Sequence, residues 1–164
     1  MPRIKMVVFD FDGVFTDGKF YFGNNQCVTK CYNAKDSWAI KLLNAKDIKT
    51  GVITLDPYVS IENAPHIFPR LDKACIVSDK PKLDILKEWC VEYNIDLSEV
   101  AYIGDDLPDI PVLKNVGFSA CPSDAVNEVK KVCDYICTKS GGNGAVREFV
   151  DLILNLINCV LDKN

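Results

Sequence analysis

Hydrophobic and polar positions follow two patterns that alternate along the chain. Short apolar runs predict buried strands, and most are followed by a stretch with apolar residues at helical spacing. Strands are expected at residues 6–10, 51–55, 75–77, 100–104 and 117–121, with 134–138 as a candidate sixth. Helices are expected at 36–46, 59–67, 81–93, 109–115, 124–132 and 145–161. This order predicts an α/β fold in which a parallel sheet is flanked by helices.

Residues 19–33 break the alternation. They are rich in aromatic and β-favouring residues around Gly23, Asn24 and Asn25, which predicts a β-hairpin with its turn at those three residues. The hairpin directly follows an acidic segment, so it is expected to overhang a site there or to pair with another subunit. No internal repeat, low-complexity tract or linker interrupts the chain, and residues 1–164 are expected to form a single domain.

Composition narrows the classes of partner. The net charge of −4 disfavours nucleic acid or an anionic membrane as the main partner. No apolar stretch reaches the ~18 residues of a membrane-spanning helix, and no signal-peptide pattern precedes the first strand, so a cytoplasmic protein is expected. The eight cysteines form no C-x-x-C pair and His66 is the only histidine, which is not the spacing of a zinc site.

Two carboxylates, Asp10 and Asp12, leave the end of the first expected strand on a loop that contains Gly13. Like charges this close repel, and each raises the pKa of the other unless a cation shares the site. A solvated acidic turn is the alternative, but such a turn needs only one Asp and rarely follows a buried run. The pattern therefore favours a cation-binding catalytic loop.

Other polar residues stand at the ends of the following strands. Thr54 ends the second, Lys80 follows the third, and Asp105 follows the fourth. In an open parallel sheet, ligands bind outside the carboxyl ends of the strands. We therefore expect these side chains to converge with Asp10 and Asp12 on one edge.

Each of these residue types has a role in phosphoryl transfer, where catalysis consists mainly of positioning and charge neutralisation. One Asp can attack phosphorus, and a second can protonate the leaving oxygen and later activate water. Asp10, Asp105 and a backbone carbonyl offer the oxygen ligands that Mg²⁺ prefers. The Thr54 hydroxyl and the Lys80 ammonium are expected to hold phosphoryl oxygens.

At these residues the chain resembles the haloacid dehalogenase superfamily of phosphohydrolases. The four signatures of that superfamily occur in order: D-x-D-G-x-x-T-D at residues 10–17, a strand-ending Thr at 54, a Lys at 80, and G-D-D-x-x-D at 104–109. The resemblance implies a Rossmann-like fold with a β-hairpin flap. Residues 37–53 hold one helix and the following strand, which leaves no room for a cap domain.

The same resemblance implies residue roles. Asp10 becomes the nucleophile of an aspartyl-phosphate mechanism and Asp12 the general acid and base. Mg²⁺ is bound by Asp10, the carbonyl of Asp12, and Asp105. Asp106 and Asp109 support the metal or Lys80.

Nearly the whole chain resembles a capless group within the superfamily. That group includes the 3-deoxy-octulosonate 8-phosphate phosphatases, the nonulosonate 9-phosphate phosphatases and the phosphatase-like domain of acylneuraminate cytidylyltransferases. The stretches that carry the likeness are 21–25, 33–36, 101–106 and 141–148. The resemblance implies a phosphorylated 2-keto-3-deoxy sugar acid as the substrate. It also implies a homotetramer whose subunits share sites.

The expected substrate-binding residues are Asn33, Lys35, Asp36, Asp56 and Arg147. Two of them depart from the group's pattern, because Lys35 stands where its sugar phosphatases usually carry Arg and Asp56 lies where an anionic substrate is expected. Lysine lacks the bidentate grip of arginine on a carboxylate or phosphate. A second hypothesis therefore stays open: a catalytically weak or inactive phosphatase-like module, associated with acylneuraminate cytidylyltransferase function, that serves tetramer assembly.

Overall fold

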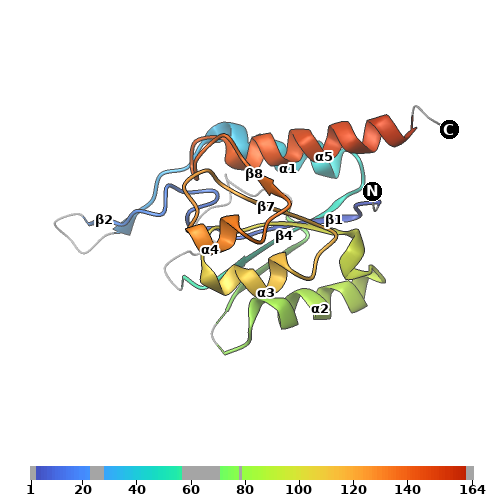
Figure 1. Ribbon diagram of the computed structural model, residues 1–164, viewed down its shortest axis with the longest axis horizontal. Coiled ribbons are helices and arrows are strands. Elements are labelled where there is room, and N and C mark those ends of the chain that lie inside the picture. Colours follow the sequence, from blue (N-terminus) through green and yellow to red (C-terminus); the bar gives the residue numbers. More distant parts are fainter. Residues whose placement is uncertain (1–2, 23–27, 57–70, 78, 162–164) are drawn as a thin grey trace.

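The computed structural model describes residues 3–22, 28–56, 71–77 and 79–161, and a six-stranded sheet runs through its centre (Figure 1). The strand order is β5-β4-β1-β6-β7-β8, and every neighbouring pair is parallel. The strands are β1 (Met6–Phe9), β4 (Lys49–Thr54), β5 (Lys73–Ile76), β6 (Val100–Ile103), β7 (Phe118–Cys121) and β8 (Tyr135–Ile136). The expected parallel α/β sheet is confirmed, including its sixth strand.

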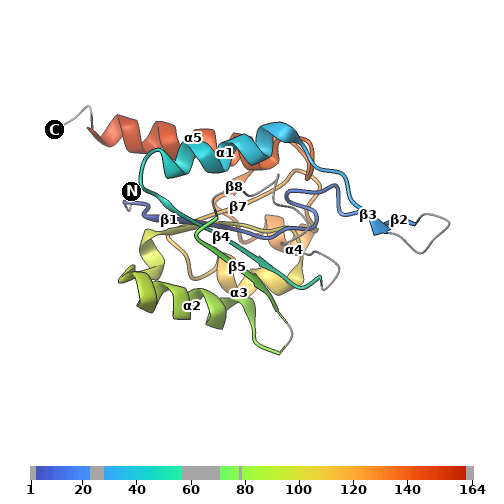
Figure 2. The same cartoon turned by 180° about the vertical axis from the view of Figure 1, so that it is seen from behind.

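Helices cover both faces of this sheet. Figures 1 and 2 show α1 (Ala34–Asn44) and α5 (Ala145–Leu161) side by side on one face, and α2 (Lys82–Tyr93) with α3 (Ile110–Leu113) on the other. The short helix α4 (Asn127–Lys130) lies near the carboxyl ends of the strands. None of the described helices has both the length and the apolar character needed to cross a bilayer.

Two helices are shorter than the sequence predicts. Residues 107–109 form a 3₁₀ turn before α3, where the carboxylate of Asp109 accepts hydrogen bonds from two backbone N–H groups. The start expected at residue 124 is wrong, because Asp124 accepts a hydrogen bond from the N–H of Gly141 and α4 begins three residues later. The helix expected at 59–67 lies outside the described residues.

The core explains why the central strands are apolar throughout. All four residues of β1 and of β6 are buried, since helices cover them from both sides. On one face the inner side of α5 places Val146, Phe149 and Ile153 in the same cluster as β1 residues, with Phe149 stacked on Phe118. The helical spacing of the apolar residues in 145–161 thus forms the core-facing side of α5.

The hairpin is present at the carboxyl edge of the sheet. Its strands β2 (Tyr21–Phe22) and β3 (Val28–Thr29) pair antiparallel, and a bridge between Thr16 and Tyr32 closes its base. Figure 2 shows it projecting from the body of the molecule on the side opposite the two termini. The expected turn at 23–25 lies outside the described residues.

Two glycines allow the loops at the carboxyl edge to approach one another. Gly13 has a φ of 73°, and an added Cβ would overlap the carboxylate of Asp105. An added Cβ at Gly141 would overlap the backbone carbonyl of Gly13. The 141–144 segment therefore packs directly on the acidic loop after β1.

We predict that Gly141→Ala destabilises the fold by about 1–3 kcal/mol, because its methyl group meets a backbone carbonyl that has no rotamer to escape into. Urea unfolding measures the change. Lys139→Ala is the matched control, since the Lys139 side chain is exposed and its hydrogen bonds with Glu148 and Ser123 are made by its backbone, which alanine keeps. Equal stability of Gly141→Ala and the control would contradict this account of the loop contact.

Candidate active site

A cavity of about 480 Å³ opens at the carboxyl ends of β1, β4 and β6. It lies where the sheet places the polar residues predicted from the strand ends. Its lining consists of Asp10, Asp12, Gly13, Gly18, Phe20, Thr54, Leu55, Asp56, Lys82, Asp105, Asp106 and Pro108. The structure thus brings together the carboxylates that follow β1 and β6.

Asp10 follows β1 directly and is only 7% exposed. Its Oδ1 accepts a hydrogen bond of 2.7 Å from the Phe11 N–H and lies 2.9 Å from Nζ of Lys82. Burial raises the pKa of Asp10 well above its usual range, the charge on Asp109 adds to that rise, and Lys82 opposes it. Both donors hold Oδ1, so the carboxylate has a fixed orientation.

Lys82 is the buried cation of the site. Its ammonium lies 2.8 Å from Oδ1 of Asp109 as well as 2.9 Å from Asp10, and the residue is 4% exposed. Burial alone would lower the pKa of Lys82, but its attraction to the two carboxylates outweighs that effect and the pKa is raised. Lys82 therefore stays charged beside Asp10.

Asp109 organises the acidic loop after β6. Its Oδ1 also accepts a 2.6 Å hydrogen bond from the hydroxyl of Tyr102, while its Oδ2 accepts from the N–H groups of Asp105 and Asp106. The residue is completely buried, so these partners compensate its charge. The sequence predicts a supporting role for Asp109, and in the structure its side chain contacts Lys82 and the backbone of the loop after β6.

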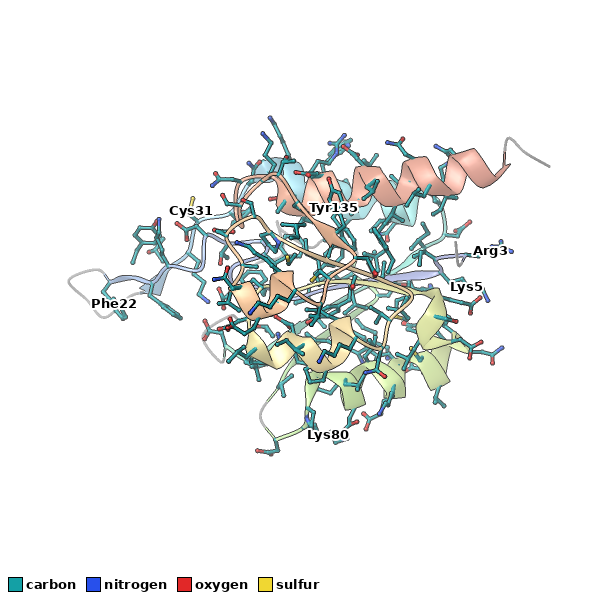
Figure 3. The ribbon with its side chains drawn as sticks, viewed as in Figure 1. Arg3, Lys5, Phe22, Cys31, Lys80 and Tyr135 are labelled. Atoms are coloured by element: carbon teal, nitrogen blue, oxygen red, sulfur yellow. The ribbon has the colours of Figure 1, made fainter. Side chains whose placement is uncertain are left out.

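Lys80 is not in this site, which corrects the sequence prediction. Its ammonium pairs with Glu88 at 2.6 Å, and its side chain is 59% exposed on the outer surface beside α2 (Figure 3). The reason is that α2 begins at Lys82, which faces the core together with Ile85, Leu86 and Trp89. The helical spacing of these buried positions was the sequence signal that distinguishes Lys82 from Lys80.

Asp105 completes a candidate cation site. One carboxylate oxygen from each of Asp10, Asp105 and Asp109 lies within 4.8 Å of the others. Burial, followed by the charge on Asp109, raises the pKa of Asp105 to about 7. Since both oxygens of Asp109 already accept hydrogen bonds, Asp10 and Asp105 are the carboxylates best placed to hold a divalent ion, and oxygen ligands of this kind suit Mg²⁺.

The remaining acidic residue of that loop, Asp106, is exposed at the rim of the cavity. Its Oδ1 accepts a 2.7 Å hydrogen bond from the N–H of Leu107 and thereby caps the 3₁₀ turn. Its contact with the backbone supports the shape of the loop.

Asp12 is held by two donors. Thr16 Oγ1 donates to its Oδ1 at 3.1 Å, and the ammonium of Lys30 lies 2.6 Å from both of its oxygens. Burial raises the pKa of Asp12, against the opposing effect of Lys30. Lys30, on the hairpin, was not among the predicted site residues, and no local pattern around it indicates that it returns to the loop after β1.

Thr54 and Asp56 both line the cavity. Thr54 is buried at the end of β4, and its Oγ1 accepts a 3.2 Å hydrogen bond from the N–H of Asp56. Because Oγ1 acts as the acceptor in this bond, the Thr54 hydroxyl can still donate its own proton. The Asp56 carboxylate forms an ion pair with Lys30, so the negative charge in this part of the cavity is paired within the chain.

The other expected substrate-binding residues do not reach Asp10. Asn33, Lys35 and Arg147 line a second cavity of about 550 Å³, and Asp36 is fully buried. They cluster because Asn33 caps α1 while the carboxylate of Asp36 accepts hydrogen bonds from the Gly144 and Arg147 N–H groups at the start of α5. Arg147 pairs with Asp151 at 2.8 Å.

The chain is similar to known hydrolases. A family model described as haloacid dehalogenase-like hydrolase matches residues 76–149. The 3-deoxy-D-manno-octulosonate 8-phosphate phosphatase KdsC of Escherichia coli K12 is 32% identical over 158 residues, which cover 93% of this chain and 80% of the relative. That of Yersinia pestis is 33% identical over the same shares of the two chains.

Solved structures agree with the sequence comparisons. The Yersinia pestis 3-deoxy-D-manno-octulosonate 8-phosphate phosphatase superimposes with a TM-score of 0.87 at 33% identity, covering 94% of this chain and 83% of that one. The corresponding enzyme of Moraxella catarrhalis, in complex with a magnesium ion, a phosphate ion and a KDO molecule, gives 0.86 at 31% identity over 98% and 92% of the two chains.

Lys80 and Lys82 lie only two residues apart, but replacing them should have very different effects on stability. Lys82→Met leaves Asp10 and Asp109 without their shared cation, so we expect it to lower the free energy of unfolding by about 3–5 kcal/mol. Lys80→Met removes only a surface ion pair and should change the free energy of unfolding by less than about 0.5 kcal/mol. Denaturant unfolding of both variants checks this, and a larger loss in Lys80→Met would reverse the assignment.

Proposed function

The chain belongs to the haloacid dehalogenase-like hydrolase family, and on that premise we propose that it is a Mg²⁺-dependent phosphomonoesterase that forms an aspartyl-phosphate on Asp10. The observation that carries the proposal is the buried Asp10 carboxylate, held 2.9 Å from Lys82 in one cavity with Asp12, Thr54 and Asp105. A nucleophile, a proton donor, a hydroxyl, an ammonium and a metal ligand are thereby available to one phosphoryl group.

In the first half of the reaction, a carboxylate oxygen of Asp10 attacks phosphorus and the bond between phosphorus and the leaving oxygen breaks. Oδ1 of Asp10 is held by Phe11 and Lys82, which leaves Oδ2 clear of these two donors. Asp12 gives its proton to the leaving oxygen, so the product departs as a neutral alcohol. Burial raises the pKa of Asp12, which is the direction that favours uptake of a proton, while Lys30 opposes the shift.

In the second half, water attacks the phosphorus of the aspartyl-phosphate and the bond to Asp10 breaks. Asp12, now a carboxylate, takes the proton from that water, and inorganic phosphate leaves. The Thr54 hydroxyl and the Lys82 ammonium donate to the phosphoryl oxygens that carry the developing charge. In this proposal Lys82 holds the phosphoryl oxygens, the role that the sequence predicts for Lys80.

Mg²⁺, when bound by Asp10 and Asp105 together with the Asp12 carbonyl, neutralises phosphoryl charge and offsets repulsion within the site. The residues fit such an ion because three carboxylate oxygens converge within 4.8 Å while Lys82 is the one cation near Asp10 among the described residues. The magnesium ion in the Moraxella relative supports the same choice of metal.

For the substrate we propose a 2-keto-3-deoxy sugar acid phosphate. The names of the relatives and the KDO molecule bound to one of them support this class. We further propose a homotetramer in which the second cavity, with Asn33, Lys35 and Arg147, completes a neighbour's site. The exposed aromatic residues of the hairpin support association through that segment: Phe20, Tyr21, Phe22 and Tyr32.

The same exposed aromatics are the observation that favours the second candidate, a phosphatase-like module whose function is assembly. Retention of Asp10, Asp12, Lys82 and Asp105 in one cavity favours the enzyme, because a scaffold has no need of a repulsive acidic cluster. A tetramer with no turnover across a panel of sugar acid phosphates would support the module instead.

The nucleophile has a direct test. Asp10→Asn should reduce the release of p-nitrophenol from p-nitrophenyl phosphate in the presence of Mg²⁺ by more than about 1000-fold, because the amide cannot form the aspartyl-phosphate. The melting temperature of the variant shows whether its fold is intact. Wild-type turnover in a folded Asp10→Asn variant would rule out the proposed mechanism.

Mg²⁺ should stabilise the wild-type protein, by about 2.7 kcal/mol when its free concentration is about 100 times its Kd. Asp105→Asn should melt no lower than the wild type without metal, since one repulsive charge is gone, yet gain little from Mg²⁺. Thermal unfolding with and without MgCl₂ measures both effects. Glu128→Gln, on the exposed side of α4, is the control that should keep the full response.

A further inference from the structure

We propose that Lys30, carried by the stem of the hairpin, is the positioning residue for Asp12, and that Asp56 in turn holds Lys30. The inference rests on the proposed function, because it concerns the group that would protonate the leaving oxygen. It assigns the hairpin a part in the chemistry of its own chain's cavity, whose lining includes Phe20.

The geometry of the contact is specific. The Lys30 ammonium lies 2.6 Å from Oδ1 and 2.6 Å from Oδ2 of Asp12, and it also donates to Oδ2 of Asp56. Asp12 follows β1 and Asp56 follows β4, so one side chain connects two loops of the sheet edge through the hairpin. Both oxygens of Asp12 are engaged, which fixes the plane of its carboxylate.

The position of Lys30 is itself constrained. Its side chain is 13% exposed, and its ammonium lies 4.8 Å from the ring centroid of Phe20 and 5.8 Å from that of Phe11. Aromatic faces attract an ammonium, and the Asp56 side chain that pairs with Lys30 is only 10% exposed. A surface lysine that met Asp12 by chance would have neither rings nor a second carboxylate around it.

Thr16 alone does not fix Asp12. Its hydroxyl donates to Oδ1 only, at 3.1 Å, and the same Oγ1 accepts from the N–H groups of Gly13 and Gly18. Lys30 is the described donor that reaches Oδ2 of Asp12. Without it the carboxyl group can rotate about its χ2 bond, and proton transfer depends steeply on that orientation.

A leaving-group comparison tests the proposal. Phenyl phosphate and p-nitrophenyl phosphate have nearly the same shape, but phenol is much the poorer leaving group and needs the proton from Asp12 more. We expect Lys30→Met, which keeps an unbranched side chain but removes the charge, to lower kcat/KM for phenyl phosphate by about 10–100-fold and for p-nitrophenyl phosphate by less than about 3-fold. Lys30→Arg, which keeps the cation, should recover most of the loss.

Two further variants separate positioning from folding. Asp56→Asn should give the same leaving-group-dependent loss to a smaller degree, since it weakens the hold on Lys30 only. Lys19→Met, on the same hairpin with its ammonium 3.8 Å from Asp17, should leave both substrates unaffected. The melting temperature of each variant identifies any loss of fold.

The outcomes distinguish this inference from the proposed function. Suppose that the wild type turns over both esters. If Lys30→Met then loses the same fraction of activity on each ester, or loses none on either, the positioning role is wrong and the proposed phosphatase activity is unaffected. If the folded wild type with Mg²⁺ turns over neither ester, the phosphatase itself is wrong and the role of Lys30 falls with it.

Discussion

The buried ammonium of Lys82 between Asp10 and Asp109 is the interaction on which the site depends. An isolated charge in the interior is very unfavourable, so these three groups are stable only together. The hydroxyl of Tyr102 and the N–H groups of the 105–106 loop provide the remaining hydrogen bonds to Asp109. The triad therefore ties the ends of β1 and β6 to the start of α2.

The same triad leaves the site with an excess of negative charge. Asp10, Asp105 and Asp109 converge on a region where Lys82 is the nearby cation, and the pKa of Asp105 is raised to about 7 as a result of burial and of Asp109. A divalent ion removes this repulsion when it binds. The mutual repulsion of these carboxylates is thus the feature that suits the cavity to a divalent cation.

Loop packing and the hairpin both support this geometry. Gly13 and Gly141 permit backbone contacts that no side chain would allow, which keeps the loop after β1 close to Asp105. In addition, Lys30 brings the hairpin against Asp12 and Asp56. The position of the hairpin and that of the Asp12 carboxylate are therefore linked through one side chain.

Local sequence patterns were enough to predict the parallel sheet, five of its strands with a candidate sixth, and the edge at which the polar strand-end residues gather. Apolar runs and helical spacing are local properties, and parallel strands necessarily bring Asp10, Thr54 and Asp105 to one edge. The order of the acidic signatures sufficed to indicate phosphoryl transfer and Mg²⁺. None of these predictions depends on which side chains from distant parts of the sequence come into contact.

Which charges pair with one another, in contrast, depends on how the elements pack. The choice of Lys82 over Lys80 depended on which face of α2 meets the sheet, and the return of Lys30 to Asp12 depended on the path of the hairpin. Asn33, Lys35 and Arg147 lie around another cavity because α1 and α5 pack together on one face. Ion pairs between segments far apart in the chain follow from packing, which no local pattern of residues contains.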